Sequence, residues 1–175
     1  MSAALVFMMG EFSAEFPVDR LYAKNHMWAQ LQSPGVLRFG LSAYAVRLLQ
    51  DVYFLDLTIE PEMVLSAKQE IGSIESKKAE SSLYSPVPGT VSALNDALLQ
   101  DPTEINLDKY GAGWMFEMML ESSPAELPEL PESPESLPAA NLSGASPLLD
   151  PEQYLQHLTS AWEVAQRTIK GQVNA

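Results

Sequence analysis

The sequence predicts a mainly β domain of the sandwich or barrel type, followed by a linker and one C-terminal helix. Between residues 19 and 120, short apolar runs alternate with turn-forming residues, as in all-β proteins. Seven of the thirteen prolines then lie between Pro124 and Pro151, in a stretch rich in Glu and Ser that is typical of an extended or disordered linker. After this stretch, apolar residues recur at helical spacing.

The β domain is expected to contain short strands separated by turns that contain proline or glycine. The strands are expected at Met27–Gln32, Val36–Gly40, Val52–Leu57, Glu70–Glu75, Ala79–Ser85, Gly89–Leu94 and Trp114–Leu120. The turns are expected at Ser33-Pro34-Gly35, Glu60-Pro61, Pro86-Val87-Pro88-Gly89 and Gly111-Ala112-Gly113. Two short helices interrupt this pattern, one at Leu41–Leu49 with Ser42 as its cap and one at Ala93–Leu99.

Four segments are therefore expected along the chain. They are an N-terminal extension (1–18), a β domain (19–120), a Pro/Glu/Ser-rich linker (121–147) and a C-terminal helix (148–171). Asp150 is expected to cap this helix, Pro151 suits its first position, and Lys170-Gly171 mark its end. Its apolar face, formed by Tyr154, Leu155, Leu158 and Trp162, is expected to pack on the β domain.

Composition narrows the classes of partner. The chain carries 23 acidic and 10 basic residues, a net charge of −13, which disfavours binding to nucleic acid or to anionic lipid. Cysteine is absent, so a thiol nucleophile and a Cys-ligated metal are excluded. No signal peptide, transit peptide or membrane span is recognisable. We therefore expect a soluble, cytoplasmic and monomeric protein.

Two adjacent lysines, Lys77 and Lys78, fall at the tip of the hairpin predicted between residues 70 and 85. Lysine at such a tip is ordinarily a solubility device that discourages edge pairing. An exposed lysine keeps its ammonium group and is a poor nucleophile or base unless it is buried or crowded by other cations. It can carry a covalent cargo, because a rigid hairpin presents the amine to an attaching enzyme.

The segment around these lysines, Glu75-Ser76-Lys77-Lys78-Ala79 followed by Leu83-Tyr84-Ser85-Pro86-Val87-Pro88-Gly89, resembles the lipoyl-lysine segment of the glycine cleavage system H protein family. Further similarity lies in His26-Met27-Trp28, Gly40–Ala45, Asp51–Leu57, Asn95–Leu99 and Tyr110-Gly111-Ala112-Gly113-Trp114. The resemblance covers roughly residues 19 to 120 and 147 to 160. It implies a barrel-sandwich hybrid fold with short helices and a C-terminal helix.

The resemblance implies that lipoate is attached to Lys78, since Glu75 stands three residues before it and Ala79 one after. Glu75 would be read by the lipoate-attaching enzyme. The chain would catalyse nothing alone. It would carry the aminomethyl group from glycine decarboxylase (P protein) to the aminomethyltransferase (T protein), and dihydrolipoamide dehydrogenase (L protein) would reoxidise the lipoyl group.

Alternatives remain open from the sequence, because Ala43 and Gln50 stand where the family often has a polar residue and a glycine. The first alternative is a divergent paralogue that relays lipoate to other enzymes or serves another pathway. A second alternative is an unmodified protein-interaction module, and a third is an enzyme with Lys78 as a Schiff-base lysine. No metal site is expected, because His26 and His157, the only histidines, fall in different predicted elements; His26 is expected to be structural.

Overall fold

The computed structural model describes residues 4–120 and 148–173, with the backbone alone described for residues 166–173. The strands are β1 (Ala4–Met9), β2 (Phe12–Pro17), β3 (Leu21–Ala23), β4 (Met27–Ser33), β5 (Val36–Leu41), β6 (Val52–Leu57), β7 (Val64–Leu65), β8 (Glu70–Ser76), β9 (Glu80–Tyr84), β10 (Gly89–Leu94), β11 (Phe116–Leu120) and β12 (Leu148–Leu149). The helices are α1 (Ala43–Leu49), α2 (Asp96–Gln100), α3 (Glu104–Leu107) and α4 (Pro151–Val173). The predicted linker, 121–147, lies outside the described residues.

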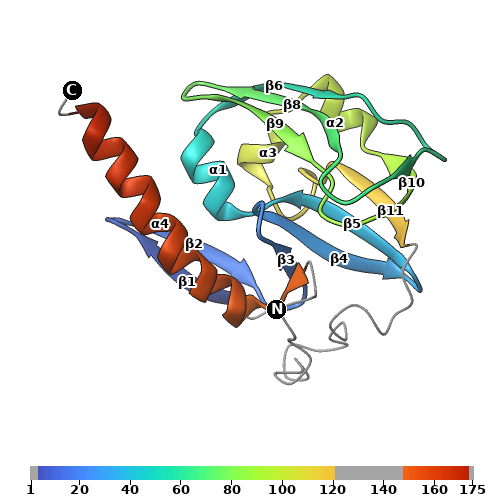
Figure 1. The fold of residues 1–175 in the computed structure, drawn as a ribbon. Coiled ribbons are helices and arrows are strands. Elements are labelled where there is room, and N and C mark those ends of the chain that lie inside the picture. Colours follow the sequence, from blue (N-terminus) through green and yellow to red (C-terminus); the bar gives the residue numbers. More distant parts are fainter. Residues whose placement is uncertain (1–3, 121–147, 174–175) are drawn as a thin grey trace.

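Two sheets form the body of the domain. The larger one has seven strands in the order β12-β3-β4-β5-β11-β10-β7, and the smaller one has three in the order β6-β8-β9. Figure 1 shows the three-stranded sheet as the upper layer, with β4 and β5 below it and α4 lying across the hairpin of β1 and β2. The predicted mainly β fold, with short helices and a C-terminal helix, is confirmed.

The main core lies between these two sheets. Leu37, Phe39 and Phe116 from the larger sheet and Ile71 and Ile74 from β8 are fully buried, and the rings of Phe39 and Phe116 stack with centroids 5.1 Å apart. Burial of such side chains is worth roughly 1.5 to 3 kcal/mol each. Strand β8 is therefore held firmly by its inward face while its opposite face remains outside.

The predicted strands agree with the structure to within one or two residues at either end, and Val52–Leu57 and Gly89–Leu94 agree at both ends. The second predicted helix begins at Asp96 rather than Ala93, because Asn95 caps it by accepting a hydrogen bond from the Leu98 amide. The hairpin of β1 and β2 was not predicted. Its first strand is a continuous apolar run without alternation, and Gly10 forms the turn with a φ of 67°.

Helix α4 begins as expected, since the Gln153 amide donates to Asp150 Oδ1 at 2.8 Å. Tyr154 and Leu158 on its apolar face are fully buried, and the Tyr154 ring stacks on Tyr22 with centroids 4.7 Å apart. The helix continues to Val173, two residues beyond the predicted end at Lys170-Gly171. Glycine lowers helix propensity but keeps its backbone N–H, and it need not end a helix.

The prediction that the Ser42 side chain caps α1 is also wrong. Ser42 occupies the cap position, but its hydroxyl contacts the Tyr154 hydroxyl at 2.8 Å and makes no capping hydrogen bond. The Ala43 amide at the start of the helix donates instead to the Tyr110 hydroxyl at 2.9 Å. Serine is thus used to bind α4, and a tyrosine that is distant in the sequence satisfies the helix N-terminus.

Candidate functional site

The two predicted cargo lysines lie at the turn between β8 and β9, at the left-hand end of the upper layer in Figure 1. The strands that lead to this turn are antiparallel, and Glu75 pairs with Glu80 as the last register pair before it. Lys77 and Lys78 are both exposed. The structure therefore places both amines at the end of a hairpin whose other face is buried in the core.

Ser76 organises the turn. Its amide donates to the Ala79 carbonyl at 2.8 Å, and its hydroxyl donates to the same carbonyl at 3.0 Å. The same hydroxyl oxygen accepts from the amides of Ala79 at 3.1 Å and Lys78 at 3.3 Å. Only 5% of Ser76 is exposed. A single buried hydroxyl thus satisfies the backbone of a turn that would otherwise depend on solvent.

The backbone distinguishes the two lysines. The Lys77 amide donates to the Asp51 carbonyl at 2.9 Å, which ties this residue to the segment before β6. The Lys78 amide is bonded only within the turn, through the Ser76 hydroxyl. Lys77 therefore anchors the tip to the neighbouring strand, and Lys78 lies at the freer position.

Glu75 lies on the outward face of β8, beside the tip. Its partners in register are Glu80 on β9 and Phe54 on β6, so the three side chains form one row across the sheet. Glu75 is partly exposed and both of its partners are exposed. The carboxylate is thus accessible to a protein that approaches Lys78 from outside.

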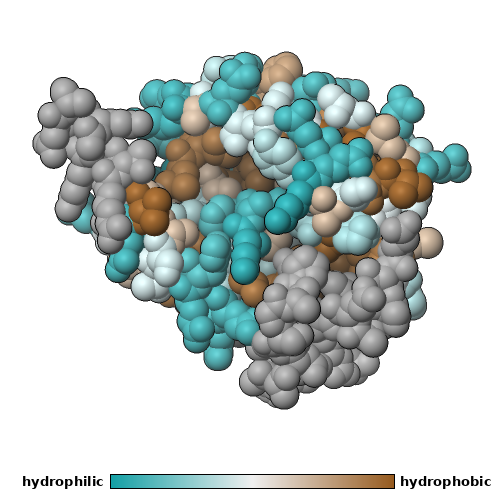
Figure 2. Space-filling view, in the orientation of Figure 1, coloured by the Kyte–Doolittle hydropathy of each residue, from teal (hydrophilic) through white to brown (hydrophobic). Residues whose placement is uncertain are grey.

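An apolar hollow of about 190 Å³ opens between β9 and α1. Leu48, Ile74 and Leu83 line it together with Ser82, which follows Lys78 by four residues. Figure 2 shows apolar residues gathered in a hollow between the upper layer and α1, on a face that is otherwise largely hydrophilic. Its volume suits a small apolar group rather than a nucleotide or cofactor of drug size.

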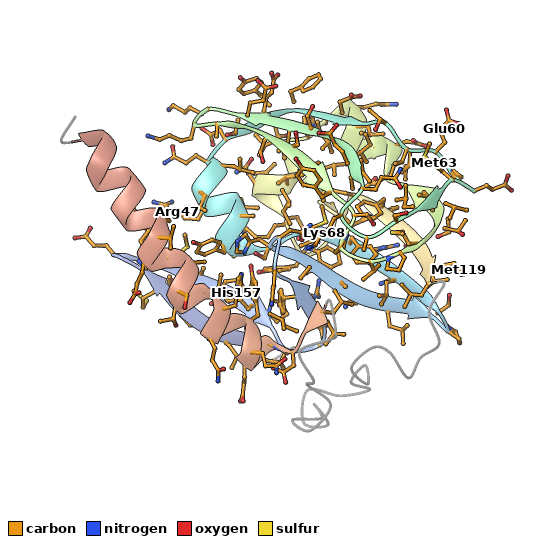
Figure 3. All side chains as sticks on the ribbon, in the orientation of Figure 1. Arg47, Glu60, Met63, Lys68, Met119 and His157 are labelled. Carbon is orange, nitrogen blue, oxygen red and sulfur yellow. The ribbon has the colours of Figure 1, made fainter. Side chains whose placement is uncertain are left out.

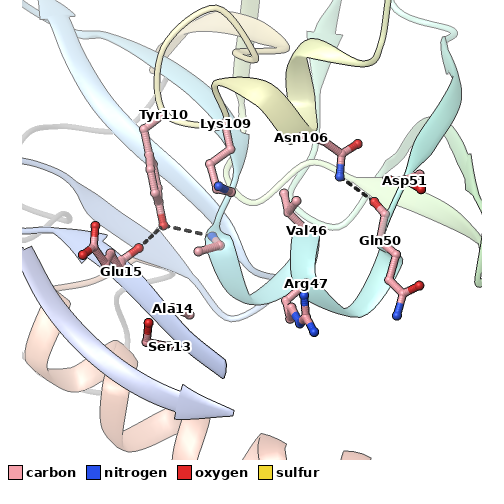
Figure 4. A pocket seen from close by; sticks show the side chains of 11 residues that line it. Ser13, Ala14, Glu15, Val46, Arg47, Gln50, Asp51, Asn106, Lys109 and Tyr110 are labelled. Atoms are coloured by element: carbon pink, nitrogen blue, oxygen red, sulfur yellow. Dashed lines mark hydrogen bonds between the residues drawn. The ribbon is translucent and has the colours of Figure 1, made fainter. Parts of the chain in front are cut away.

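A larger polar pocket, of about 660 Å³, lies between β2 and α1 (Figure 4). Two fully bonded side chains frame it: the Tyr110 hydroxyl donates to the Glu15 carbonyl at 2.6 Å, and Asn106 Nδ2 donates to the Gln50 carbonyl at 2.6 Å. Both side chains tie distant segments together. We assign the framing residues to the architecture that supports α1 and β6.

His26 and His157, which the sequence placed in separate elements, come together in the structure. Their ring centroids are 5.8 Å apart, and His26 Nδ1 lies 2.8 Å from the Tyr154 hydroxyl. Burial, reinforced by the nearby His157, lowers the pKa of His26 to about 4. Within residues 4–120 and 148–165, no three His, Asp or Glu side chains cluster closely enough to hold a metal ion. The pair serves to dock α4 through Tyr154.

The family model for the glycine cleavage H-protein matches residues 20–137, which includes both strands of the tip hairpin. The chain belongs to this family. The hairpin of β1 and β2 precedes the matched residues.

Individual relatives agree with this assignment. A glycine cleavage system H protein of Stenotrophomonas maltophilia is 41% identical over 147 residues, covering 83% of this chain and 95% of the relative. Glycine cleavage system H protein 2 of Pseudomonas aeruginosa is 41% identical over 116 residues, covering 65% of this chain and 86% of the relative. The crystal structure of a glycine cleavage system H protein from Mycobacterium marinum matches with a TM-score of 0.63 at 28% identity, over 82% of this chain and 99% of that one.

The described helices also bear on the predicted absence of a membrane span. None of them combines the length and the apolar composition that a bilayer crossing requires.

Proposed function

We propose that this chain is the lipoyl carrier of a glycine cleavage system, with lipoate attached to Lys78. The observation that carries the proposal is an exposed lysine on a turn whose backbone is fixed by Ser76 and by the Asp51 carbonyl. Family membership supports lipoate as the cargo. The amine of Lys78 is accessible to an attaching enzyme, so the tip fits the group.

Lipoate held by Lys78 would supply a disulfide that is reduced as it accepts the aminomethyl group at glycine decarboxylase, and a dithiol that dihydrolipoamide dehydrogenase can reoxidise after the group has left at the aminomethyltransferase. The protein's own residues fix the point from which the arm swings. Ser76 keeps the turn closed, and β8 ties the turn to the core through Ile71 and Ile74. Tethering keeps the cargo at high effective concentration near each partner enzyme.

The same proposal extends to the rest of the chain. Residues 19–120 form the carrier domain, α4 belongs to the same folded unit, and the segment 121–147 connects them. The chain works as a non-catalytic, monomeric subunit in the cytoplasm, and Glu75 is read by the lipoate-attaching enzyme.

The test is reconstitution with the three partner enzymes. The lipoylated full chain is expected to support glycine-dependent release of CO₂ and reduction of NAD⁺. The Lys78→Arg variant is expected to support neither reaction. Lys77→Ala is the matched control, because it removes the neighbouring amine and leaves its backbone hydrogen bond intact. Equal activity of Lys78→Arg would refute the proposal. Modification without glycine-dependent activity would indicate that the chain relays lipoate to other enzymes. Absence of modification would indicate an unmodified interaction module.

A further inference from the structure

The outward face of the three-stranded sheet carries exposed aromatic side chains beside the tip. A β-bulge in β6 causes this exposure: Val52 pairs with Ser76 and Phe54 with Glu75, which leaves Tyr53 as an extra residue between them. Consecutive residues of a regular strand point to opposite faces, but a bulge allows neighbours to point the same way. Tyr53 is 63% exposed and Phe54 is 44% exposed.

Carboxylates lie on the same face of the sheet as Phe54. Phe54, Glu75 and Glu80 are register partners and share one face of the sheet, and Asp56 follows Phe54 on the same face. Glu75 and Glu80 are direct cross-strand partners, and like charges in this position are destabilising. We call the set of Tyr53, Phe54, Asp56, Glu75 and Glu80 the tip face. It exposes large apolar groups and clustered negative charge, neither of which benefits the isolated fold.

The length of the Lys78 side chain, bare or loaded, decides which partner enzyme must contact the tip face. A bare lysine side chain holds its amine only a few ångströms from the backbone, whereas a loaded arm extends much farther. Glu75 and Glu80 form the last register pair before the turn that carries Lys78, and Phe54 pairs with Glu75. An enzyme that acylates the bare amine must therefore bind close to this row of the tip face, while an enzyme that receives the loaded arm can bind farther away.

We propose that the tip face is the docking surface for the enzyme that acylates Lys78. The partner presents an apolar socket for Phe54 and Tyr53, with basic side chains around it for Asp56, Glu75 and Glu80. Exposed aromatic anchors supply most of the energy of such contacts, and surrounding charges mainly set the association rate. This inference rests on the proposed function.

The reaction at this surface is an acyl transfer without oxidation or reduction. The Lys78 ammonium loses a proton to solvent, and its neutral nitrogen attacks the carbonyl carbon of a lipoyl adenylate, the co-substrate that the enzyme makes from lipoate and ATP. The amide C–N bond forms, the bond from the carbonyl carbon to the phosphate oxygen breaks, and AMP leaves. The tip face takes no part in this chemistry and acts through positioning.

The experiment measures lipoylation of the unmodified full-length chain by a lipoate–protein ligase with ATP and lipoate, followed by intact mass. Phe54→Ala is expected to lower kcat/KM by about tenfold, mainly through KM, and Tyr53→Ser to lower it in the same way. Glu80→Gln is expected to lower kcat/KM about threefold and to weaken its dependence on salt. The melting temperature of Glu80→Gln should be unchanged or higher, because a like-charge pair is removed.

Met119→Ala and Glu60→Gln are the matched controls. Met119 is 54% exposed and Glu60 is exposed, and Figure 3 shows both at the opposite end of the molecule from the β8–β9 turn. Both variants are expected to be lipoylated at the rate of the unaltered chain. Circular dichroism verifies that Phe54→Ala is folded.

If folded Phe54→Ala and Tyr53→Ser are lipoylated as fast as Met119→Ala, this inference is overturned and the carrier function stands. If the unaltered chain accepts no lipoyl group, both this inference and the proposed carrier function fail.

Discussion

Replacement of Tyr154 by phenylalanine tests how α4 is held on the β domain. The Tyr154 hydroxyl lies 2.8 Å from the Ser42 hydroxyl and 2.8 Å from His26 Nδ1, in surroundings where Ser42 and Tyr154 are fully buried. Burial raises the pKa of Tyr154 well above its ordinary value, and the hydrogen bond from Ser42 opposes this shift. The hydroxyl is therefore hydrogen-bonded to both Ser42 and His26.

The substitution keeps the ring and its stacking on Tyr22 but removes both hydrogen bonds. Each bond contributes about 1 kcal/mol, and a buried partner left unpaired costs about 1 to 3 kcal/mol. We expect the free energy of unfolding to fall by about 2 to 3 kcal/mol, measured by urea denaturation with the slope unchanged.

Tyr84→Phe, at an exposed tyrosine, is the control and should have no measurable effect. Hydrogen exchange should accelerate in α4 more than in β8. A Tyr154→Phe variant as stable as Tyr84→Phe would show that the buried hydroxyl does not hold the helix.

Three further predictions concern His26, Gln50 and Ser76. The folded-state pKa of His26, about 4, lies below the unfolded value of about 6.5, so its contribution to stability is complete above pH ~6.5 and is lost as the pH falls towards 4. Asparagine tolerates the φ of 73° at this position, so the His26→Asn variant should fold. Its free energy of unfolding should depend less on pH between 6.5 and 4, and an unchanged dependence would contradict the lowered pKa of His26. Gln50 has a φ of 62° and a ψ of −133°, a backbone conformation that is strained for any residue but glycine. Gln50→Gly should therefore raise the free energy of unfolding by about 1 kcal/mol, and a lower free energy would show that position 50 is not strained. Ser76→Ala should accelerate hydrogen exchange at the Lys78 and Ala79 amides and lower stability by about 1 kcal/mol, whereas unchanged exchange would mean that water replaces the hydroxyl.

The sequence was informative wherever a local rule governed the structure. The short apolar run Val52–Leu57 and the turn residues before Gly89 predicted their strands correctly, and the Asp150-Pro151 pair predicted the start of α4. Gly89, which the sequence places in a turn, is required in the structure because of a neighbouring strand. A Cβ there would lie 2.5 Å from the Met119 carbonyl oxygen, so close approach of β11 explains it.

Features that depend on contacts between distant residues could not be predicted from the sequence. The Ser42–Tyr154 contact spans 112 positions, and no local pattern indicates that a potential helix cap will bind another helix instead. The bulge at Tyr53 shifts the register of β6 against β8, and it is therefore invisible to a pattern confined to β6. The tip face could not be predicted for this reason, although both lysines and Glu75 were placed correctly at the hairpin end.

The proposed function depends on a lipoyl group attached to Lys78. The most direct measurement is intact mass and peptide mapping of the full chain purified from its native cells. We expect a mass increase of one lipoyl group, located on the peptide that contains Lys78 and absent from the Lys78→Arg variant, with Lys77→Ala modified normally. A chain that remains unmodified while other proteins of the same cells are lipoylated, or a lipoyl group found on Lys77, would contradict it.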